Sequence, residues 1–493
     1  MDKPVKDAPA GAFRAPPLSE GEKNVIIGGV LLSMLLAALD QTIVAPAMPT
    51  IAGALGDAEY LPWIVTAYLL TATAIAPLYG KLSDIYGRRL TIYAALLIFL
   101  AGSVIAALSS NMFVLIIARA VQGLGGGGLF TLAQTVIGDL VPPLERARYA
   151  AWISGTWAVA SIAGPLLGGT FAEHLHWSLI FWINIPLGVL AMIIINAPLK
   201  KLPIVARQHR IDAYGATLLV AATSLLLLAL NWGGSRFPWL SGQILGLLAI
   251  SVVFWVLFAR CLLTAVEPLV SLEVLSNRIV LAGTLGLFML QAANVGLAVY
   301  LPVYLQSWLG LTASESGTAL LGLLLGTVAG ASISGRIIPR FIHYKRIAIV
   351  GVALATACLF VFGLLADRTS LVLVEVLTTG AGFGAGMLYP VGTVSVQNAV
   401  DRAHLGVATG VMTFLRTLGG ALGVAALGAI ALGYGLPLGH EGASAVRVAD
   451  TAPFAAIFLG AAALMFACLV AIWLMPEKAL RGRDPETPPV VVE

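Results

Sequence analysis

Long apolar runs constrain the fold of this chain more than any other feature of its sequence. A helix needs about 20 apolar residues to cross the hydrocarbon core of a bilayer. Runs of this kind occur at about 25–47, 62–79, 90–108, 113–137, 150–172, 178–197, 213–231, 241–262, 279–303, 316–338, 347–365, 371–398, 407–431 and 453–474. We therefore predict an all-α integral membrane protein with 14 transmembrane helices, for which the lipid bilayer is the surrounding partner.

The composition supports this prediction and argues against other classes. Hydrophobic residues make up 59% of the 493 residues and charged residues 11%, whereas a soluble protein has roughly 25% charged residues. The net charge of +4 is small and the basic residues are scattered, so we expect no nucleic-acid partner. The three cysteines lack metal-type spacing, so we expect no metal site.

The distribution of basic residues predicts the topology. With both tails inside, the cytoplasmic segments hold 23 of the 28 Lys and Arg residues, and the outside loops hold Arg236, Arg368 and Arg447. The remaining two, Arg119 and Arg416, fall inside predicted spans. This asymmetry follows the positive-inside rule. We predict that both tails, residues 1–24 and 475–493, are cytoplasmic.

An internal repeat divides the chain. The glycine-rich stretches that begin at Ala118 and Val374 superpose after a shift of 256 residues, which also places Glu375 on Arg119. The shift exceeds six spans by about two, and the apolar pair at about 213–231 and 241–262 accounts for the excess. We predict two pseudo-symmetric six-helix bundles, 25–197 and 279–474, joined by a linker at 198–278 that holds two inserted helices. Repeated halves around a midplane site are typical of transporters.

Five motifs occur in order at the corresponding spans: "LDQTIVAPAMP" (39–49), "GKLSDIYGRRL" (80–90), "IIARAVQGLGGGG" (116–128), "SIAGPLLGG" (161–169) and "WSLIFWINIPLG" (177–188). In these motifs the chain resembles the major facilitator superfamily, and within it the fourteen-span drug/proton antiporters. The sequence departs from the family pattern at Ala45-Pro46 and at Pro339, which stands where the first half has Asp84. The second departure predicts a charge clamp that differs between the halves.

The resemblance implies a major facilitator fold and proton-coupled antiport that exports small hydrophobic, often cationic compounds by alternating access. It implies a transporter of the bacterial inner membrane that functions as a monomer, with the proton gradient as its energy source and no cofactor. Alternatives on the same fold are export of a lipid, a siderophore or a specific metabolite, or a sensor that binds ligand without transport. A membrane enzyme is disfavoured because all six histidines lie outside the predicted spans, and "GLGGGG" lacks the Lys-Ser/Thr of a nucleotide-binding loop.

Three charged residues are candidates for proton coupling. Asp40 lies near the middle of the first span, where a charge costs at least ~2.5–3.5 kcal/mol. Burial disfavours the charged form of a carboxyl group, so Asp40 is a candidate proton carrier. Glu375 is a second candidate. Arg119 keeps its charge and needs a partner, for which Asp40 is the natural choice. The alternatives are static roles, in which backbone groups hold Asp40 and Arg119 and water solvates Glu375.

Two motifs are candidates for gating. In the loop motif, Gly80 and Gly87 allow close approach and turning. The resemblance assigns Asp84, Arg88 and Arg89 to a charge clamp that stabilises the outward-facing state; a purely topogenic basic loop is the alternative. In the fifth run, the small residues Gly164, Gly168 and Gly169 with Pro165 predict a tightly packed, bent helix, for which plain close packing is the alternative.

A cavity for lipophilic substrates needs aromatic faces and a few polar groups. The candidates in the predicted spans are Gln41, Tyr68, Trp157, Asn184, Phe288, Gln291, Asn294, Tyr300, Tyr389 and Gln397. Core packing or lipid contact is the alternative for each aromatic residue. The inserted helices carry no interior charge, so we expect no chemistry there.

Overall fold

The computed structural model describes residues 18–56, 60–200, 212–234, 236–265, 267–311, 313–368, 370–434, 436 and 450–480. Most of the predicted tails and part of the predicted linker lie outside the described residues. The helices are α1 (Glu20–Leu55), α2 (Leu61–Tyr86), α3 (Arg88–Ala107), α4 (Met112–Leu140), α5 (Pro143–His174), α6 (Leu179–Trp182), α7 (Asn184–Leu199), α8 (Ala213–Trp232), α9 (Gly242–Thr264), α10 (Leu272–Ser276), α11 (Arg278–Ser307), α12 (Ala313–Ile337), α13 (Lys345–Leu364), α14 (Leu371–Ala399), α15 (Leu405–Gly433) and α16 (Ala452–Leu474).

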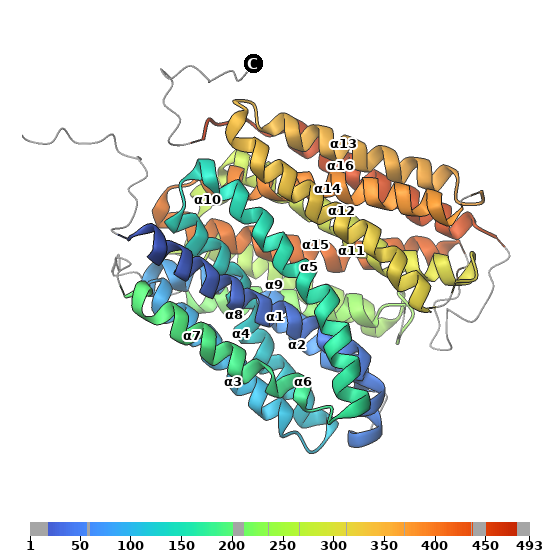
Figure 1. Cartoon of the computed structure of the whole chain (residues 1–493), viewed down its shortest axis with the longest axis horizontal. Coiled ribbons are helices and arrows are strands. Elements are labelled where there is room, and N and C mark those ends of the chain that lie inside the picture. Colours follow the sequence, from blue (N-terminus) through green and yellow to red (C-terminus); the bar gives the residue numbers. More distant parts are fainter. Residues whose placement is uncertain are drawn as a thin grey trace, which may run out of the picture.

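The long helices pack as two groups with the same internal arrangement. In the first group, α1 packs on α5 and α7, while α4 packs on α2 and α3. In the second group, α11 packs on α15 and α16, while α14 packs on α12 and α13. Figure 1 shows the groups side by side, the first in blue to green and the second in yellow to red. The matching helix pairs are those that the sequence repeat relates.

Successive spans run in alternate directions, so α1 begins and α16 ends at the same end of the molecule, on the left in Figure 1. We call this the basic end, because the turn between α2 and α3 with Arg88 and Arg89 belongs to it, and we call the other the distal end. Gly87 makes that turn with a φ of 83°, a conformation that glycine adopts without strain.

Thirteen stretches among the described residues are long and apolar enough to cross a membrane. They coincide with thirteen of the fourteen predicted runs. The remaining run, 150–172, lies in α5, a helix of 32 residues that is not among these stretches. Its glycines, serines and threonines are residues of the kind that let membrane helices pack closely.

The predicted span at 178–197 is interrupted. It consists of a single turn, α6, followed by α7, with Ile183 between them. Pro186 has no N–H to donate to the carbonyl of Trp182, which favours a new helix start at this point. The interruption lies directly before Asn184, whose side chain enters the site described below.

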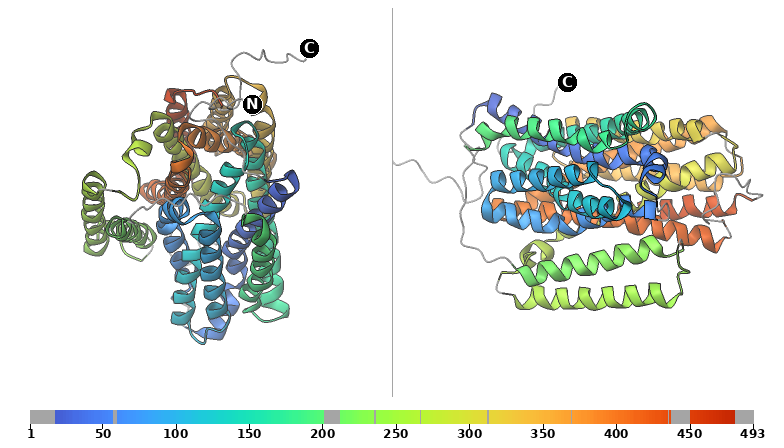
Figure 2. Two further views of the ribbon diagram at one scale, coloured as in Figure 1. Left: turned by 90° about the vertical axis from the view of Figure 1, so that its left-hand side faces the viewer. Right: turned by 90° about the horizontal axis from the view of Figure 1, so that it is seen from below.

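The inserted helices α8 and α9 pack on each other, and α8 also packs on α2 and α15. They therefore lie at the seam between the two groups, on one side of the molecule, as the two green helices of Figure 2 show. Aromatic contacts join them to both groups: the rings of Trp232 and Trp63 are 5.7 Å apart, and those of Trp255 and Phe414 are 6.3 Å apart.

Candidate functional site: a buried ion pair between two helices

Asp40 and Arg119 form an ion pair in the interior of the first group. The Nη1 atom of Arg119 lies 2.5 Å from Oδ2 of Asp40, and the side chains are 1% and 0% exposed. The other carboxylate oxygen, Oδ1, accepts hydrogen bonds from Gln122 at 3.0 Å and from Asn184 at 2.9 Å. The contact that the sequence predicted between Asp40 and Arg119 is therefore present, and both carboxylate oxygens of Asp40 have hydrogen-bond partners.

The guanidinium of Arg119 has further partners. It donates to the carbonyl of Ile64 at 3.0 Å and to Oε1 of Gln122 at 2.8 Å. Its central carbon lies 4.6 Å from the centre of the Tyr68 ring, at which distance the ring face attracts a cation. Arg119 thus keeps three kinds of contact that do not depend on the charge of Asp40.

Five helices build this site, and α2 contributes the Ile64 carbonyl and the Tyr68 ring. Asp40 comes from α1, and Arg119 and Gln122 lie one turn apart on α4, so they project from one face of that helix. Ser103 of α3 accepts hydrogen bonds from Gln122 at 2.8 Å and from Asn184 of α7 at 3.2 Å. The sequence prediction missed Gln122 and Ser103: the helical spacing from Arg119 points to Gln122, whereas no local pattern marks Ser103.

Asn184 leaves one polar atom unsatisfied. Its Nδ2 atom donates to Asp40 and to Ser103, while its Oδ1 atom is buried with no hydrogen-bond partner among the described residues. An unpartnered acceptor in a dry interior is costly. The sequence predicted Asn184 as a cavity residue, and the structure brings it to the ion pair.

Glu375 is not part of this site. Its side chain is exposed near the distal end of α14 and forms no ion pair within the described part of the chain. The shift of 256 residues that superposes it on Arg119 therefore relates two positions with different surroundings. A role for Glu375 in coupling stays a prediction.

Two residues of the predicted charge clamp, Asp84 and Arg88, contact each other at the basic end. Arg88 donates to Asp84 at 2.5 Å and, through Nε, to Asp139 of α4 at 2.6 Å. Asp84 also accepts hydrogen bonds from the backbone N–H groups of Gly406 and Val407, at 3.2 and 3.0 Å. These two groups belong to the first turn of α15, where the helix dipole favours a negative charge. Asp84 thus connects the first group of helices to the second.

Two further contacts close the basic end between the groups. A Cβ atom at Gly80 would collide with the backbone of Gly406, so the helices α2 and α15 approach each other there to backbone contact. Gln397 is buried and donates to the carbonyl of Gln134 at 3.3 Å. Gln397 therefore bridges the groups in this conformation. Arg89 lies apart from the clamp and donates to Asn196 at 3.2 Å.

The glycines of α5 differ in what surrounds them. A Cβ atom at Gly164 would collide with Thr42, and one at Gly168 with the carbonyl of Ile43, whereas Gly169 has open space. Thr42 also donates to the carbonyl of Ala160 at 2.7 Å. Pro165 lies within the helix. The motif therefore packs α5 directly against the segment of α1 that follows Asp40.

The other predicted cavity residues lie partly in the first group of helices and partly in the second. Gln41 is half-buried beside the Tyr68 hydroxyl, and Trp157 stacks on Phe130 with their ring centres 5.2 Å apart. Tyr300 is buried and donates to the carbonyl of Val424 at 3.2 Å. Phe288, Gln291, Asn294 and Tyr389 are half-buried on α11 and α14. The last three form a cluster in the second group.

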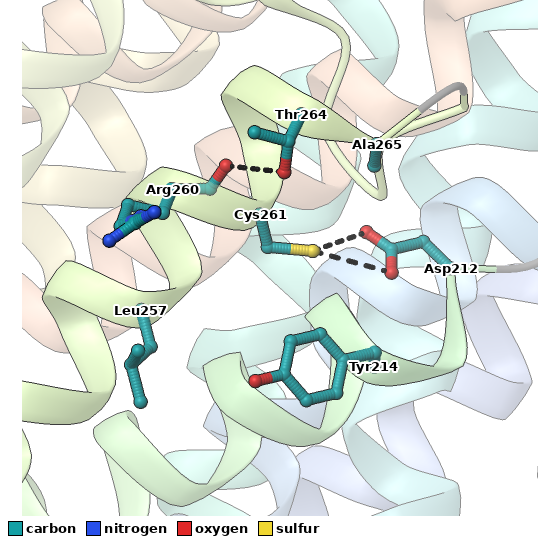
Figure 3. A pocket seen from close by; sticks show the side chains of 7 residues that line it. All are labelled: Asp212, Tyr214, Leu257, Arg260, Cys261, Thr264 and Ala265. Atoms are coloured by element: carbon teal, nitrogen blue, oxygen red, sulfur yellow. Dashed lines mark hydrogen bonds between the residues drawn. The ribbon is translucent and has the colours of Figure 1, made fainter.

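The inserted helices carry a pocket of about 420 Å3 at the basic end, lined by Asp212, Tyr214, Leu257, Arg260, Cys261, Thr264 and Ala265. Figure 3 shows Cys261 directed at Asp212 and Arg260 pointing away from it. Asp212 caps α8 by accepting from Gly215 at 2.7 Å and accepts from the N–H of Leu269 at 3.3 Å. Through Cys261, whose Sγ donates to Oδ2 of Asp212 at 3.5 Å, this carboxylate also contacts the end of α9.

The fold and these motifs have known relatives. The sequence profile of the Major Facilitator Superfamily matches residues 30–424. The chain belongs to this superfamily. It is 34% identical over 415 residues to the multidrug transporter protein MdtP of Bacillus subtilis, covering 83% of this chain and 76% of MdtP. It is 32% identical over 411 residues to multidrug resistance protein 3 of the same organism, covering 83% of this chain and 80% of that protein. The chain is a transporter and not an enzyme.

Solved structures of the superfamily share the fold. The proton:xylose symporter XylE superposes with a TM-score of 0.65 at 14% identity, covering 94% of this chain and 98% of XylE. The human organic anion transporter MFSD10 superposes with a TM-score of 0.63 at 18% identity, covering 91% and 99%. At these identities the likeness concerns the fold alone.

Proposed function

We propose that this multi-pass membrane protein is a proton-coupled antiporter that exports small hydrophobic compounds, often cationic, by alternating access. The observation that carries the proposal is the buried pair of Asp40 and Arg119, with its hydrogen bonds from Gln122 and Asn184. Two relatives named as multidrug transporters or resistance proteins support the substrate class.

The pair has the properties that a proton site needs. When Asp40 binds a proton, its attraction to Arg119 falls, while Arg119 keeps its bonds to Ile64 and Gln122 and its contact with Tyr68. Protonation therefore loosens the link between α1 and α4 without leaving the arginine unpartnered. Two states of similar free energy are what a carrier requires.

Alternating access supplies the path for the proton. Asp40 is fully buried in this conformation, so exchange with water requires a second conformation that opens the site. The contacts of Asp84, Gly80 and Gln397 between the groups lie at the basic end, which supports an outward-facing state with the basic end in the cytoplasm of a bacterial inner membrane. Counting α5 as a span gives fourteen helices in a six-two-six arrangement, and this even number returns both tails to the cytoplasm.

Transport in proteoliposomes tests the proposal. The vesicles carry a pH-sensitive dye and an imposed pH gradient, and a panel of lipophilic cationic and neutral dyes is added. We expect substrates to dissipate the gradient faster than in protein-free vesicles, and Asp40→Asn to abolish this effect. Asp367→Asn is the matched control, because Asp367 is exposed and should behave as wild type. Equal substrate-dependent proton flux in Asp40→Asn and wild type would refute the coupling role.

Export of a lipid, siderophore or specific metabolite is the second candidate. The same vesicles separate it from multidrug export: a single compound class among the panel would move, and the others would neither move nor compete. Ligand binding without any counterflow would instead identify a sensor.

A further inference from the structure

Arg416 is a charge that the proposed proton site does not use. It lies on α15, about 16 Å from the start of that helix, and its side chain is half-buried. Its guanidinium forms no hydrogen bond or ion pair with any described residue. None of its nitrogen atoms is among the buried polar atoms that lack a partner, so they reach open space between the helices. An arginine at this depth with free donors requires an acceptor.

The side of α15 that carries Arg416 faces polar groups of two other helices. One turn further along α15, a Cβ atom at Gly420 would lie 3.4 Å from the Gln291 side chain of α11. Tyr389 of α14 donates to Gln291 at 2.7 Å and accepts from Asn294 at 3.3 Å. Tyr389 also lies near enough to Arg416 for an electrostatic interaction. Arg416, Tyr389, Gln291 and Asn294 therefore form one group, which we call the Arg416 cluster.

No carboxylate of the packed helices neutralises Arg416. The helices packed against α15 are α2, α4, α8, α11, α14 and α16. Their acidic residues are Asp84, Asp139 and Glu375. Asp84 and Asp139 bind Arg88 at the basic end, and Glu375 lies about 20 Å further along the bundle axis than Arg416. Among the described residues of these helices, no carboxylate therefore lies beside Arg416.

We propose that the Arg416 cluster binds an anionic group, a carboxylate or sulfonate, of an otherwise apolar transported compound. The fork of a guanidinium fits two oxygen atoms of such a group, and the amides of Gln291 and Asn294 offer further donors. The half-buried ring of Phe288 on α11 supplies an apolar surface nearby. This inference rests on the proposed export function and departs from it in the charge of the exported compound: it assigns an anionic group to that compound, whereas the proposed function names compounds that are often cationic.

Binding of three probes with one fluorophore tests the inference. Dansyl-phenylalanine carries a carboxylate, its methyl ester is neutral, and dansylcadaverine is a cation. We expect the purified protein in detergent to bind the carboxylate at least 10-fold more tightly than the ester, and the cation most weakly. Equal binding of acid and ester, preference for the cation, or failure to bind any of the three would overturn the proposal.

Variants test whether Arg416 causes the preference for the carboxylate. Arg416→Gln should remove the preference for the carboxylate and leave the affinity for the ester unchanged, while Arg416→Lys should retain part of the preference. Arg368→Gln is the control, because the side chain of Arg368 is 82% exposed. A preference for the carboxylate that survives in Arg416→Gln would contradict the assignment. If Arg416→Gln does not fold, the order of the affinities of the wild type for the three probes decides whether the proposal stands.

The export function is tested separately by counterflow of the neutral ester in proteoliposomes. If the carboxylate binds as expected but no probe moves, the export proposal fails and the cluster stands. If the ester is transported but the carboxylate has no advantage in binding, the cluster fails and export stands.

Discussion

At the scale of single residues, the proposed coupling depends on how the charged form of Asp40 is stabilised. Arg119 supplies a charge, and Gln122 and Asn184 supply one hydrogen bond each. Hydrogen bonds to a carboxylate favour its charged form. Each donor therefore sets part of the pH range over which the site exchanges its proton.

Replacing Asn184 should change that range. In Asn184→Ala, Asp40 loses one donor at 2.9 Å. We expect the pH profile of proton-coupled flux to change, because a hydrogen bond to a charged group contributes about 1.5–3 kcal/mol. Flux measured across a series of external pH values checks this. Asn196→Ala, an exposed position on the same helix, should leave the profile in place; an unchanged profile in Asn184→Ala would contradict the proposed role.

The sequence predicted only part of this site. Asp40 and Arg119 are visible because a charged residue within a long apolar run is rare and needs a partner. Asn184 and Ser103 come from helices far away along the chain, separated from Asp40 or from each other by 144 and 81 residues. Their convergence is a property of packing, which no local pattern records.

At the scale of helices, the contact of α5 with α1 depends on two glycines. Added methyl groups at Gly164 or Gly168 would collide with Thr42 or with the backbone at Ile43, whereas Gly169 faces open space. We expect Gly164→Ala and Gly168→Ala each to destabilise the protein by about 1–3 kcal/mol, and Gly169→Ala to have little effect. Thermal unfolding in detergent measures the difference. Equal stability of all three variants would contradict the prediction, because it would show that α1 and α5 can move apart at little cost in free energy.

The charge clamp at Asp84 also connects different helices, because Asp84 of α2 contacts α3 and α15. Asp84→Asn should weaken the contacts with Arg88 and with the first turn of α15, at a cost of about 1–2 kcal/mol to the closed basic end, or roughly a 5- to 30-fold change in population. Spin labels at the exposed positions Tyr86 and Phe341 report the distance between the groups there. We expect the longer distance to become more populated in Asp84→Asn than in wild type, and no change in Asp367→Asn. Identical distance distributions would argue against the clamp.

Helix positions were largely predictable, because apolar runs of this length have few alternatives to a membrane helix. The exceptions have physical causes. Pro186 divides one predicted span into α6 and α7. The short helix α10 gave no signal, because five residues are too few for a periodic pattern.

At the scale of the whole molecule, the two groups of helices contact each other along two seams, and different helices form each seam. Along one seam, α2 approaches α15 and the inserted α8 packs on both. Along the other, α5 packs on α12 and α14. A rocking motion of the groups must therefore carry the inserted helices with one group or slide α8 along the other. The sequence repeat predicted the two groups, but it holds no information on where the inserted pair packs.

Proton release on substrate binding tests the central claim, that Asp40 gains and loses a proton during transport, most directly. A transported compound is added to purified protein in weakly buffered detergent solution, and the pH change is recorded across a range of starting pH. We predict that wild type and Asp367→Asn release protons on binding and that Asp40→Asn binds the compound without release. Undiminished proton release by Asp40→Asn would contradict the account.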